Sequence, residues 1–308
     1  MGRYTVRRLL QLIPVVLGTT FIIHFLVWQL PGDPFAGRCG DRPCAPAFVA
    51  MMTEKYQLDE PWIFQYLTFL KNLLVGDFGE SFNGVPVAQI LADTWPVTIR
   101  LALVGIAFEI IIGIGAGVLT GMRRGGFLDN LSLVTTLFFL AIPVFVIGFT
   151  LQYLLGVQFP IIRPTVTPEA RWDELIVPGF VLASLQMAIV VRLARSTIVE
   201  NLRSDYVRTA TAKGLPRMRV VGVHLLRNSL IPVVTFLGTD LGNLMGGAVV
   251  TEGIFNINGV GGQLFRAIHL HDSTIIVPMV TVLVLVYLSV NLLVDLLYAV
   301  LDPRIRYD

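Results

Sequence analysis

Long stretches without a formal charge constrain this chain more than any other feature. Asp, Glu, Lys and Arg are absent from residues 9–32, 130–162, 175–191 and 273–294. A helix needs about 20 apolar residues, within a range of about 17 to 25, to cross about 30 Å of hydrocarbon, so each stretch can span a membrane. The composition agrees, because 55% of the 308 residues are hydrophobic and only 14% are charged. We therefore expect an integral membrane protein.

Two further apolar stretches each contain one acid, Glu109 within 101–122 and Asp240 within 229–251. The sequence thus predicts an all-α membrane protein with six spans. The first span is too long for a cleaved signal peptide and no small-x-small cleavage site follows it, so we expect it to be retained. The expected division of the chain is a terminus at 1–8, spans at 9–30, 97–122, 128–157, 175–195, 229–251 and 274–301, an outer cap at 31–96, outer loops at 158–174 and 252–273, an inner segment at 196–228 and a terminus at 302–308.

The basic residues indicate the orientation of the spans. Six spans place both termini on one side, and most of the 23 Lys and Arg residues fall on that side, whereas the two short loops opposite hold only Arg163, Arg171 and Arg266. Cytoplasmic loops carry an excess of Lys and Arg. We therefore expect a multi-pass protein of the inner (cytoplasmic) membrane, in contact with membrane lipid, with both termini in the cytoplasm.

Composition and motifs exclude several functional classes. The net charge of +2 argues against a nucleic-acid binder. Two Cys and four His residues are too few for a zinc scaffold, and we expect no bound metal. His269, His271 and Asp272 resemble a metal cluster, but a solvated loop is the favoured interpretation. No His-Glu-x-x-His helix or Gly-x-Ser-x-Gly elbow supports an intramembrane hydrolase.

The outer segment 31–96 is long enough to form a small, partly helical cap, with apolar residues at helical intervals between Ala47 and Val75. Cys39 and Cys44 enclose four residues in a compartment that permits disulfides. We expect a local bridge between them, and two free thiols are the alternative.

The inner segment carries the most informative pattern of the chain. Ser204 is a plausible N-cap, and a short helix is expected to follow it, ending at Lys213. Gly214 supplies a left-handed C-cap, Pro216 stops the helix, and a second helix is expected from Arg217. The basic rim of this segment could meet an acidic surface on a partner. An ordinary positive loop beside anionic lipids is the alternative.

Acids inside the membrane usually face protein or water, since a charge at the bilayer centre costs about 2.5–3.5 kcal/mol on insertion scales. Asp240 lies near the middle of the fifth span, with Asn243 about one turn further on, and Glu109 lies in the second span. These three residues are candidates for lining a translocation pathway. The alternative is hydrogen bonding between helices of one subunit. Glycines on the fifth span favour close packing at a subunit interface: Gly238, Gly242, Gly246 and Gly247.

The chain contains no Gly-Lys pair and therefore no Gly-x-x-x-x-Gly-Lys-Ser/Thr phosphate-binding loop. We expect that it is not an enzyme and binds no cofactor of its own. Energy for any active transport would then arrive mechanically from a partner.

Several strings, in the same order along the chain, resemble the permease subunits of dipeptide and oligopeptide ABC importers. The strings are GRYTVRRLLQLIPVVLG at the start, LPGDPF, YQLDEPWIFQYLTFLKNLLVGDFGESF, YVRTATAKGLPRMRVVGVHLLRN from Tyr206 to Asn228, GGAVVTEGIF and NLLVDLLYAVLDPRIRY. Two positions depart from the family pattern. Arg208 replaces a leading glutamate, and Asn258 stands before Gly259 where Pro is usual.

The resemblance implies a type I importer in which this chain pairs with a second, similar permease, so that a heterodimer is expected. Two ATPase subunits or domains would bind ATP and Mg, and an extracytoplasmic substrate-binding protein or lipoprotein would deliver di- or oligopeptides. Nickel, haem, glutathione or another small solute is the alternative cargo, and a passive channel is the rival class. In the family the short inner helix couples to the ATPase. The matching residues are Tyr206, Arg208, Ala210, Ala212, Lys213, Gly214 and Leu215.

Overall fold

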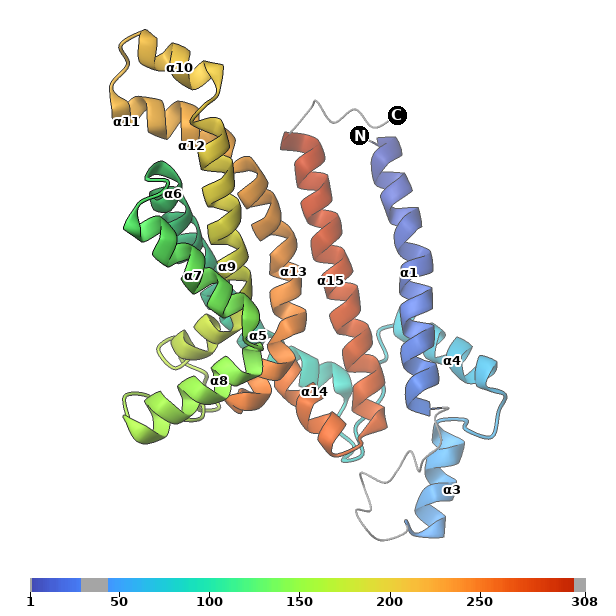
Figure 1. The fold of residues 1–308 in the computed structure, drawn as a ribbon. Helices are drawn as coiled ribbons and strands as arrows, with labels where there is room; N and C mark the ends of the chain where they lie inside the picture. Colours follow the sequence, from blue (N-terminus) through green and yellow to red (C-terminus); the bar gives the residue numbers. More distant parts are fainter. Residues whose placement is uncertain (1, 29–43, 302–308) are drawn as a thin grey trace.

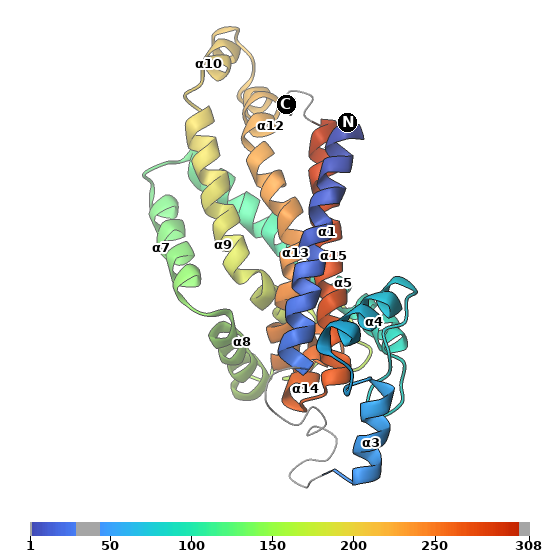
Figure 2. The same ribbon diagram turned by 90° about the vertical axis from the view of Figure 1, so that its right-hand side faces the viewer.

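The computed structural model describes residues 2–28 and 44–301. These residues form an all-helical protein, and no strand is found among them. Long helices run side by side along most of the molecule, as two perpendicular views show (Figures 1 and 2). The longest are α1 (Gly2–Trp28), α5 (Val87–Phe108), α9 (Ile176–Asn201), α13 (Ile231–Ile254) and α15 (Ser273–Leu301).

The number of possible membrane spans agrees with the sequence prediction. Within the described residues four helices are long and apolar enough to cross a membrane, and two bent helix pairs raise the number to six if each pair is one span. The chain is therefore an all-α membrane protein.

The third expected span, 128–157, is not one straight helix. It is divided into α7 (Phe127–Ala141) and α8 (Val144–Gln152), which continues as a π-helical stretch, and the two parts are bent by 98°. Pro143 lies at the break, and Ile142 before it has φ −99° and ψ 127°. Proline disfavours helical geometry in the preceding residue, which is the physical reason for the bend.

The second long helix begins earlier than expected. α5 starts at Val87, ten residues before the expected start of the second span at 97, so the helix extends into the segment expected to form the cap. It continues through a π-helical stretch, Glu109–Ile114, into α6 (Gly115–Met122). Stretches of π-helix inside an α-helix are frequent at functional sites.

Three glycines allow this second span to pack tightly against α9. A Cβ atom added to Gly113 would lie 2.7 Å from Val190 Cγ1, and one added to Gly117 would lie 2.5 Å from Ala194 Cβ. A Cβ on Gly121 would lie 2.9 Å from Ile198 Cβ. Small residues four apart let helix backbones approach closely in membranes.

Two further expected boundaries differ from the structure. α9 continues to Asn201, beyond the expected end of the fourth span at 195. The outer loop expected at 252–273 is largely helical, because α13 continues to Ile254 and α14 (Val260–His269) follows. Helical packing between α13 and α14 therefore replaces an open loop at this end of the molecule.

The cap is partly helical, as expected, and contains α3 (Pro46–Lys55) and α4 (Trp62–Leu74). Tyr66 of α4 anchors the cap to α1, because its hydroxyl group donates to the carbonyl of Leu17 at 2.8 Å and lies 2.9 Å from Thr20 Oγ1. Cys39 lies outside the described residues, so its pairing with Cys44 stays a prediction.

The two ends of the molecule differ in character. α1 begins and α15 ends at the same end as the short helix α10 (Asp205–Ala212), whereas α3, α4 and α14 lie towards the opposite end (Figure 1). The inner segment and the cap are thus separated by the length of the bundle.

The packing of α6 on α9 predicts opposite effects for two neighbouring glycines. Gly117→Ala should destabilise the protein by about 2 kcal/mol, because the new methyl group would collide with Ala194 and with the Val191 carbonyl. Gly115→Ala meets no atom within 4 Å, so it should be neutral or slightly stabilising. Thermal unfolding in detergent measures both changes, and equal losses in the two variants would contradict the packing argument.

Candidate functional site

The short helix α10 has the local structure that its sequence predicts. Ser204 is extended at the N-cap, although its hydroxyl group donates back to the Asn201 carbonyl at 2.6 Å instead of capping α10. Gly214 adopts a left-handed conformation with φ +72°, and its N–H donates to the Thr211 carbonyl at 3.0 Å. Gly adopts this conformation without the strain of a Cβ atom, so it ends the helix cleanly.

A second helical segment follows Pro216, as expected. It consists of α11 (Arg217–Arg219), a π-helical stretch (Val220–Leu225) and α12 (Leu226–Ser229). Together with α10 it forms a hairpin that projects from the end of the bundle (Figure 1).

One face of α10 packs on the chain itself. Val207 and Ala210 are buried in a cluster with Ile198 of α9 and with Leu225, and Leu215 is partly buried against the same cluster. Ala210 was expected to contact a partner, but the structure places it on this inner face. The small side chain of Ala210 therefore allows α10 to pack closely against other helices of the same chain.

The other face of the hairpin is open to solvent. Five of the seven expected coupling residues lie there and are exposed: Tyr206, Arg208, Ala212, Lys213 and Gly214. Met218, which the sequence analysis did not single out, is 85% exposed between Arg217 and Arg219. The sequence did offer a signal for Met218, because it is a large apolar residue between two cations, directly after the proline that starts a helix. An exposed apolar side chain with a cationic rim can fit a partner that has an acidic border.

A buried ion pair joins the helices beneath this hairpin. Arg195 of α9 makes a bidentate contact with Asp129 of α7, in which the distance from Arg195 Nη2 to Asp129 Oδ2 is 2.8 Å. Asp129 also accepts the backbone N–H of Gly125 at 2.8 Å. Only 2% of the Asp129 side chain and 20% of the Arg195 side chain are exposed. No local sequence pattern indicates that Arg195 and Asp129, 66 residues apart, are partners.

The intramembrane acids Asp240 and Glu109 lie inside the helix bundle, where both are fully buried. Asp240 Oδ1 accepts hydrogen bonds from Gln186 Nε2 of α9 and, at 3.2 Å, from Asn243 Nδ2. Glu109 lies close enough to Asp240 for the two carboxyl groups to interact electrostatically. Within one chain these contacts link three helices, and a role in lining the pathway stays a prediction.

The glycines of α13 differ in how closely other helices pack against them. A Cβ on Gly242 would lie 3.1 Å from Tyr287 Cδ2 of α15, so this glycine packs within the chain. A Cβ on Gly246 would meet no atom within 4 Å, which leaves space at that position.

A buried carboxylate that the sequence analysis missed joins α5, α13 and α14 at the cap end. Glu252 has no exposed surface, and its Oε1 accepts the hydroxyl of Thr98 at 2.7 Å. Its Oε2 accepts the N–H of Gly262 at 2.7 Å, and Thr98 Oγ1 accepts the N–H of Val260 at 2.9 Å. The available signal was an acid directly after the fifth span and before a glycine-rich stretch.

Asn258 has a clear role at the position where the family usually has proline. Its Oδ1 accepts hydrogen bonds from Arg266 Nη2 at 2.8 Å and from Gln263 Nε2 at 3.0 Å. Gly259, next in the chain, is extended at the N-cap of α14, where a Cβ would lie 2.3 Å from Glu252 Oε2. The side chain of Asn258 thus supports the turn into α14.

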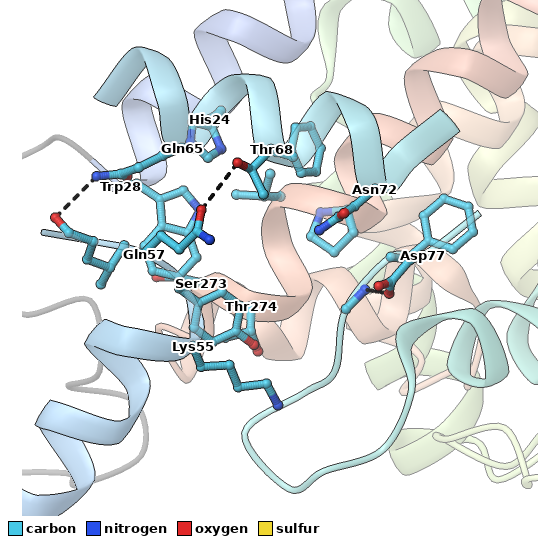
Figure 3. Close-up of a pocket in the computed structure, with 17 residues that line it drawn as sticks. His24, Trp28, Lys55, Gln57, Gln65, Thr68, Asn72, Asp77, Ser273 and Thr274 are labelled. Carbon is cyan, nitrogen blue, oxygen red and sulfur yellow. Dashed lines mark hydrogen bonds between the residues drawn. The ribbon is translucent and has the colours of Figure 1, made fainter. Parts of the chain in front are cut away.

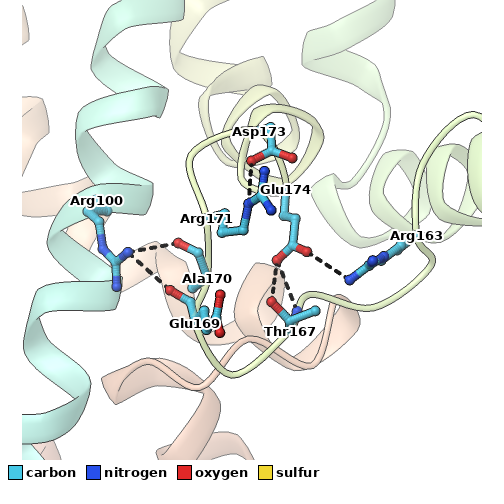
Figure 4. A network of polar contacts seen from close by, with 8 residues as sticks. All are labelled: Arg100, Arg163, Thr167, Glu169, Ala170, Arg171, Asp173 and Glu174. Atoms are coloured by element: carbon cyan, nitrogen blue, oxygen red, sulfur yellow. Dashed lines mark hydrogen bonds and ion pairs between the residues drawn. The ribbon is translucent and has the colours of Figure 1, made fainter.

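The outer connection at 158–174 is fixed by polar contacts (Figure 4). Arg100 of α5 donates through Nη1 to the carbonyls of Ala170 at 2.9 Å and Glu169 at 3.1 Å. The Thr167 hydroxyl donates to Glu174 at 2.7 Å, and this bond, together with the Thr167 N–H and Arg163, lowers the pKa of Glu174 below its ordinary value. These contacts hold the connection against α5.

His269 and Asp272, near the start of α15, make hydrogen-bonding contacts within the chain. His269 Nδ1 lies 2.8 Å from the Phe265 carbonyl, and Asp272 Oδ1 accepts the hydroxyl of Thr274 at 2.6 Å. Across residues 2–28 and 44–301, no group of three His, Cys, Asp or Glu side chains could hold a metal ion.

Models of known protein families match almost the whole length of the chain. Residues 113–307 match the family model described as the binding-protein-dependent transport system inner membrane component, and residues 1–102 match the corresponding N-terminal model. The dipeptide transport system permease proteins of Alkalihalophilus pseudofirmus and Escherichia coli strain K12 are 35% and 34% identical, and each comparison covers 100% of this chain and at least 99% of the relative. A glutathione transport system permease protein of Pectobacterium atrosepticum is 36% identical, with 100% of both chains covered.

Because Arg195 and Asp129 form a buried ion pair, the stability of the protein should depend strongly on the Asp129 carboxylate. Asp129→Ala leaves the arginine without its partner and should destabilise the protein by about 3 kcal/mol. The control is Asp173→Ala, which removes an Arg–Asp pair whose side chains are both 65% exposed and should change stability by less than about 0.5 kcal/mol. Thermal unfolding in detergent compares the two variants, and a small loss for Asp129→Ala would contradict a structural role for the pair.

Proposed function

This chain belongs to the family of binding-protein-dependent transport system inner membrane components, and we propose how it works as the permease subunit of an ABC importer for peptides. It contributes six spans to a translocation pathway that a second, similar permease completes as a heterodimer. A substrate-binding protein or lipoprotein delivers di- or oligopeptides on the outer side. The observation that supports a peptide substrate is the full-length similarity to dipeptide permeases.

The proposed site of energy input is the exposed face of α10. Two ATPase subunits bind ATP and Mg, and the contact extends from this face, with Tyr206 and the C-cap residue Lys213, to Met218 of the neighbouring α11. The chain has no Gly-Lys pair and supplies no phosphate-binding loop, so it depends on these partners for hydrolysis. α10 lies at the same end as the start of α1 and the end of α15, which supports cytoplasmic termini in the inner membrane (Figure 1).

Movement of α10 would reach the spans through packed side chains. The inner face of α10 contacts Ile198, which lies in the last turns of α9. α9 in turn holds α6 through the glycine contacts and α7 through Arg195 and Asp129. These contacts support a rigid-body switch, in which closure of the ATPase pair tips the spans from an inward-facing to an outward-facing arrangement.

Glutathione is a second candidate substrate, because a glutathione permease is 36% identical over the full length of this chain. Glutathione is itself a small peptide, so both candidates belong to one substrate class.

The choice of substrate is tested with the assembled importer in proteoliposomes. ATP-dependent uptake of a di- and oligopeptide panel, compared with glutathione, should show peptide accumulation that stops when ATP is omitted. Equal uptake without ATP would favour a passive channel. ATP-driven uptake of glutathione alone would leave the importer class intact and change the substrate.

The coupling role of α10 predicts a specific effect of its C-cap. Gly214→Ala forces a Cβ into a left-handed conformation, which should destabilise the end of α10 by about 1 kcal/mol and lower peptide uptake per ATP hydrolysed at least twofold. Gly222→Ala is the control, because Gly222 is helical and a Cβ there meets no atom within 4 Å. The measurement is the ratio of uptake to hydrolysis in proteoliposomes, and an unchanged ratio in Gly214→Ala would exclude this role.

A further inference from the structure

Two acids inside the helix bundle have carboxyl oxygens that no donor reaches. Glu109, the first residue of the π-helical stretch after α5, and Asp240, in α13, are both fully buried. Among the described residues, Glu109 Oε1, Glu109 Oε2 and Asp240 Oδ2 have no hydrogen-bond partner. Buried polar groups in native proteins are almost always hydrogen-bonded, so these three oxygens require an explanation.

The two acids differ from other buried groups without partners, because their carboxyl groups adjoin each other. The ring nitrogens of His24 and Oε1 of Gln65 also lack partners, but they belong to residues around a separate cavity of about 360 Å³ at the cap end (Figure 3). The carboxyl groups of Glu109 and Asp240 lie within hydrogen-bonding reach of each other. Their three oxygens have almost no accessible surface, so no space for a water molecule or a metal ion adjoins them.

The surrounding contacts distinguish the two acids. Asp240 Oδ1 accepts hydrogen bonds from Gln186 Nε2 of α9 and, at 3.2 Å, from Asn243 Nδ2. Glu109 receives no hydrogen bond from the described residues. Hydrogen bonds to a carboxylate favour its charged form, whereas burial without them favours the neutral acid. A neutral carboxyl group also has an O–H that can donate to a neighbouring carboxylate.

No positive charge compensates the pair in the part of the chain that the structure describes, where no ion pair includes Glu109 or Asp240. The other charged side chains of α5, α9 and α13 have different partners or are exposed: Asp93, Arg100, Arg192, Arg195, Glu200 and Glu252. On α15, Asp295 pairs with Arg8, and Tyr287 packs against α13. Two adjacent carboxylates without a counter-charge repel each other, so that one of them retains a proton.

We propose that Glu109 and Asp240 share one proton, with the Glu109 hydroxyl donating to Asp240 Oδ2, and that this proton joins the second, fourth and fifth spans in a contact that depends on pH. The pair then bears a single negative charge on Asp240, which Gln186 and Asn243 stabilise. Loss of the proton leaves two carboxylates side by side and loosens the contact between the π-helical stretch, α9 and α13. This site concerns the packing of the spans and does not depend on the substrate or on the ATPase contact.

Infrared difference spectroscopy of the purified permease–ATPase complex at neutral pH tests the proton directly. A maltoside detergent is used because it has no carbonyl group of its own. The spectrum of the wild type minus that of Glu109→Gln should show the band of a protonated carboxyl group, shifted in D₂O. The control, Glu174→Gln, removes a carboxylate that accepts two hydrogen bonds from Thr167 and should show no such band. Absence of the band from the Glu109→Gln comparison would overturn the proposal.

Two substitutions of Glu109 separate the donated hydrogen bond from simple packing. Glu109→Gln keeps an N–H donor for Asp240 Oδ2, so the melting temperature at neutral pH should change by less than about 2 °C. Glu109→Leu fills a similar volume but leaves a buried charged acceptor without a donor, so it should lower the melting temperature by at least about 5 °C. Equal shifts in the two variants would contradict the donor role of Glu109. The infrared comparison does not need Glu109→Leu, so it decides the proposal even if that variant fails to fold.

The pH dependence of thermal unfolding in the same detergent tests the effect on packing. The folded chain holds a proton that an unfolded glutamate releases at neutral pH, so the stability of the wild type should fall as the pH rises from neutral to alkaline. Glu109→Gln lacks this proton and should show a smaller fall, whereas Glu174→Gln should keep the wild-type dependence. An equal fall in the wild type and Glu109→Gln would contradict a pH-dependent contact at this site.

Discussion

The close approach of α6 to α9 is the packing interaction on which the rest of the structure depends. Gly117 and Gly121 of α6, and Gly113 in the π-helical stretch before it, face α9 with no room for a Cβ, so the two backbones are in near contact. Apolar side chains gain little by leaving lipid for another helix, and such packing must come from van der Waals contact between closely fitted surfaces. Because α9 also contacts α5, α7 and α13, it is the central helix of the bundle.

Buried polar contacts then specify how the other helices are placed around α9. Asp129 fixes α7, Asp240 joins α13 to α9, and Glu252 holds α14 against α5 and α13. Each contact lies where helices distant in sequence meet. An unpaired buried charge is costly, so every such group favours one arrangement of its neighbours over sliding or rotated alternatives. A permease that switches between two arrangements as rigid bodies benefits from units held together in this way.

Much of the fold could be predicted because membranes impose simple rules on sequence. Uncharged stretches located the spans, and the signals around Gly214 and Pro216 located α10 and its end. The bend at Pro143 was not predicted, since prolines are tolerated in many membrane helices and only packing decides whether the chain continues straight. Ala210 was assigned to a partner surface through the resemblance to the permease family, and the sequence does not say which face of a short helix packs on the chain itself.

The sequence by itself determined that the chain crosses a membrane, that its basic residues gather at one end, and that a capped helix stands there. These follow from local composition and from the conformational limits of Gly and Pro. Only the tertiary structure decided which polar groups meet, as with Arg195 and Asp129, or which buried atoms have no hydrogen-bond partner among the described residues, as with the ring nitrogens of His24 and Oε1 of Gln65. Such pairings join residues far apart in the chain, and they arise from helix packing that no local pattern encodes.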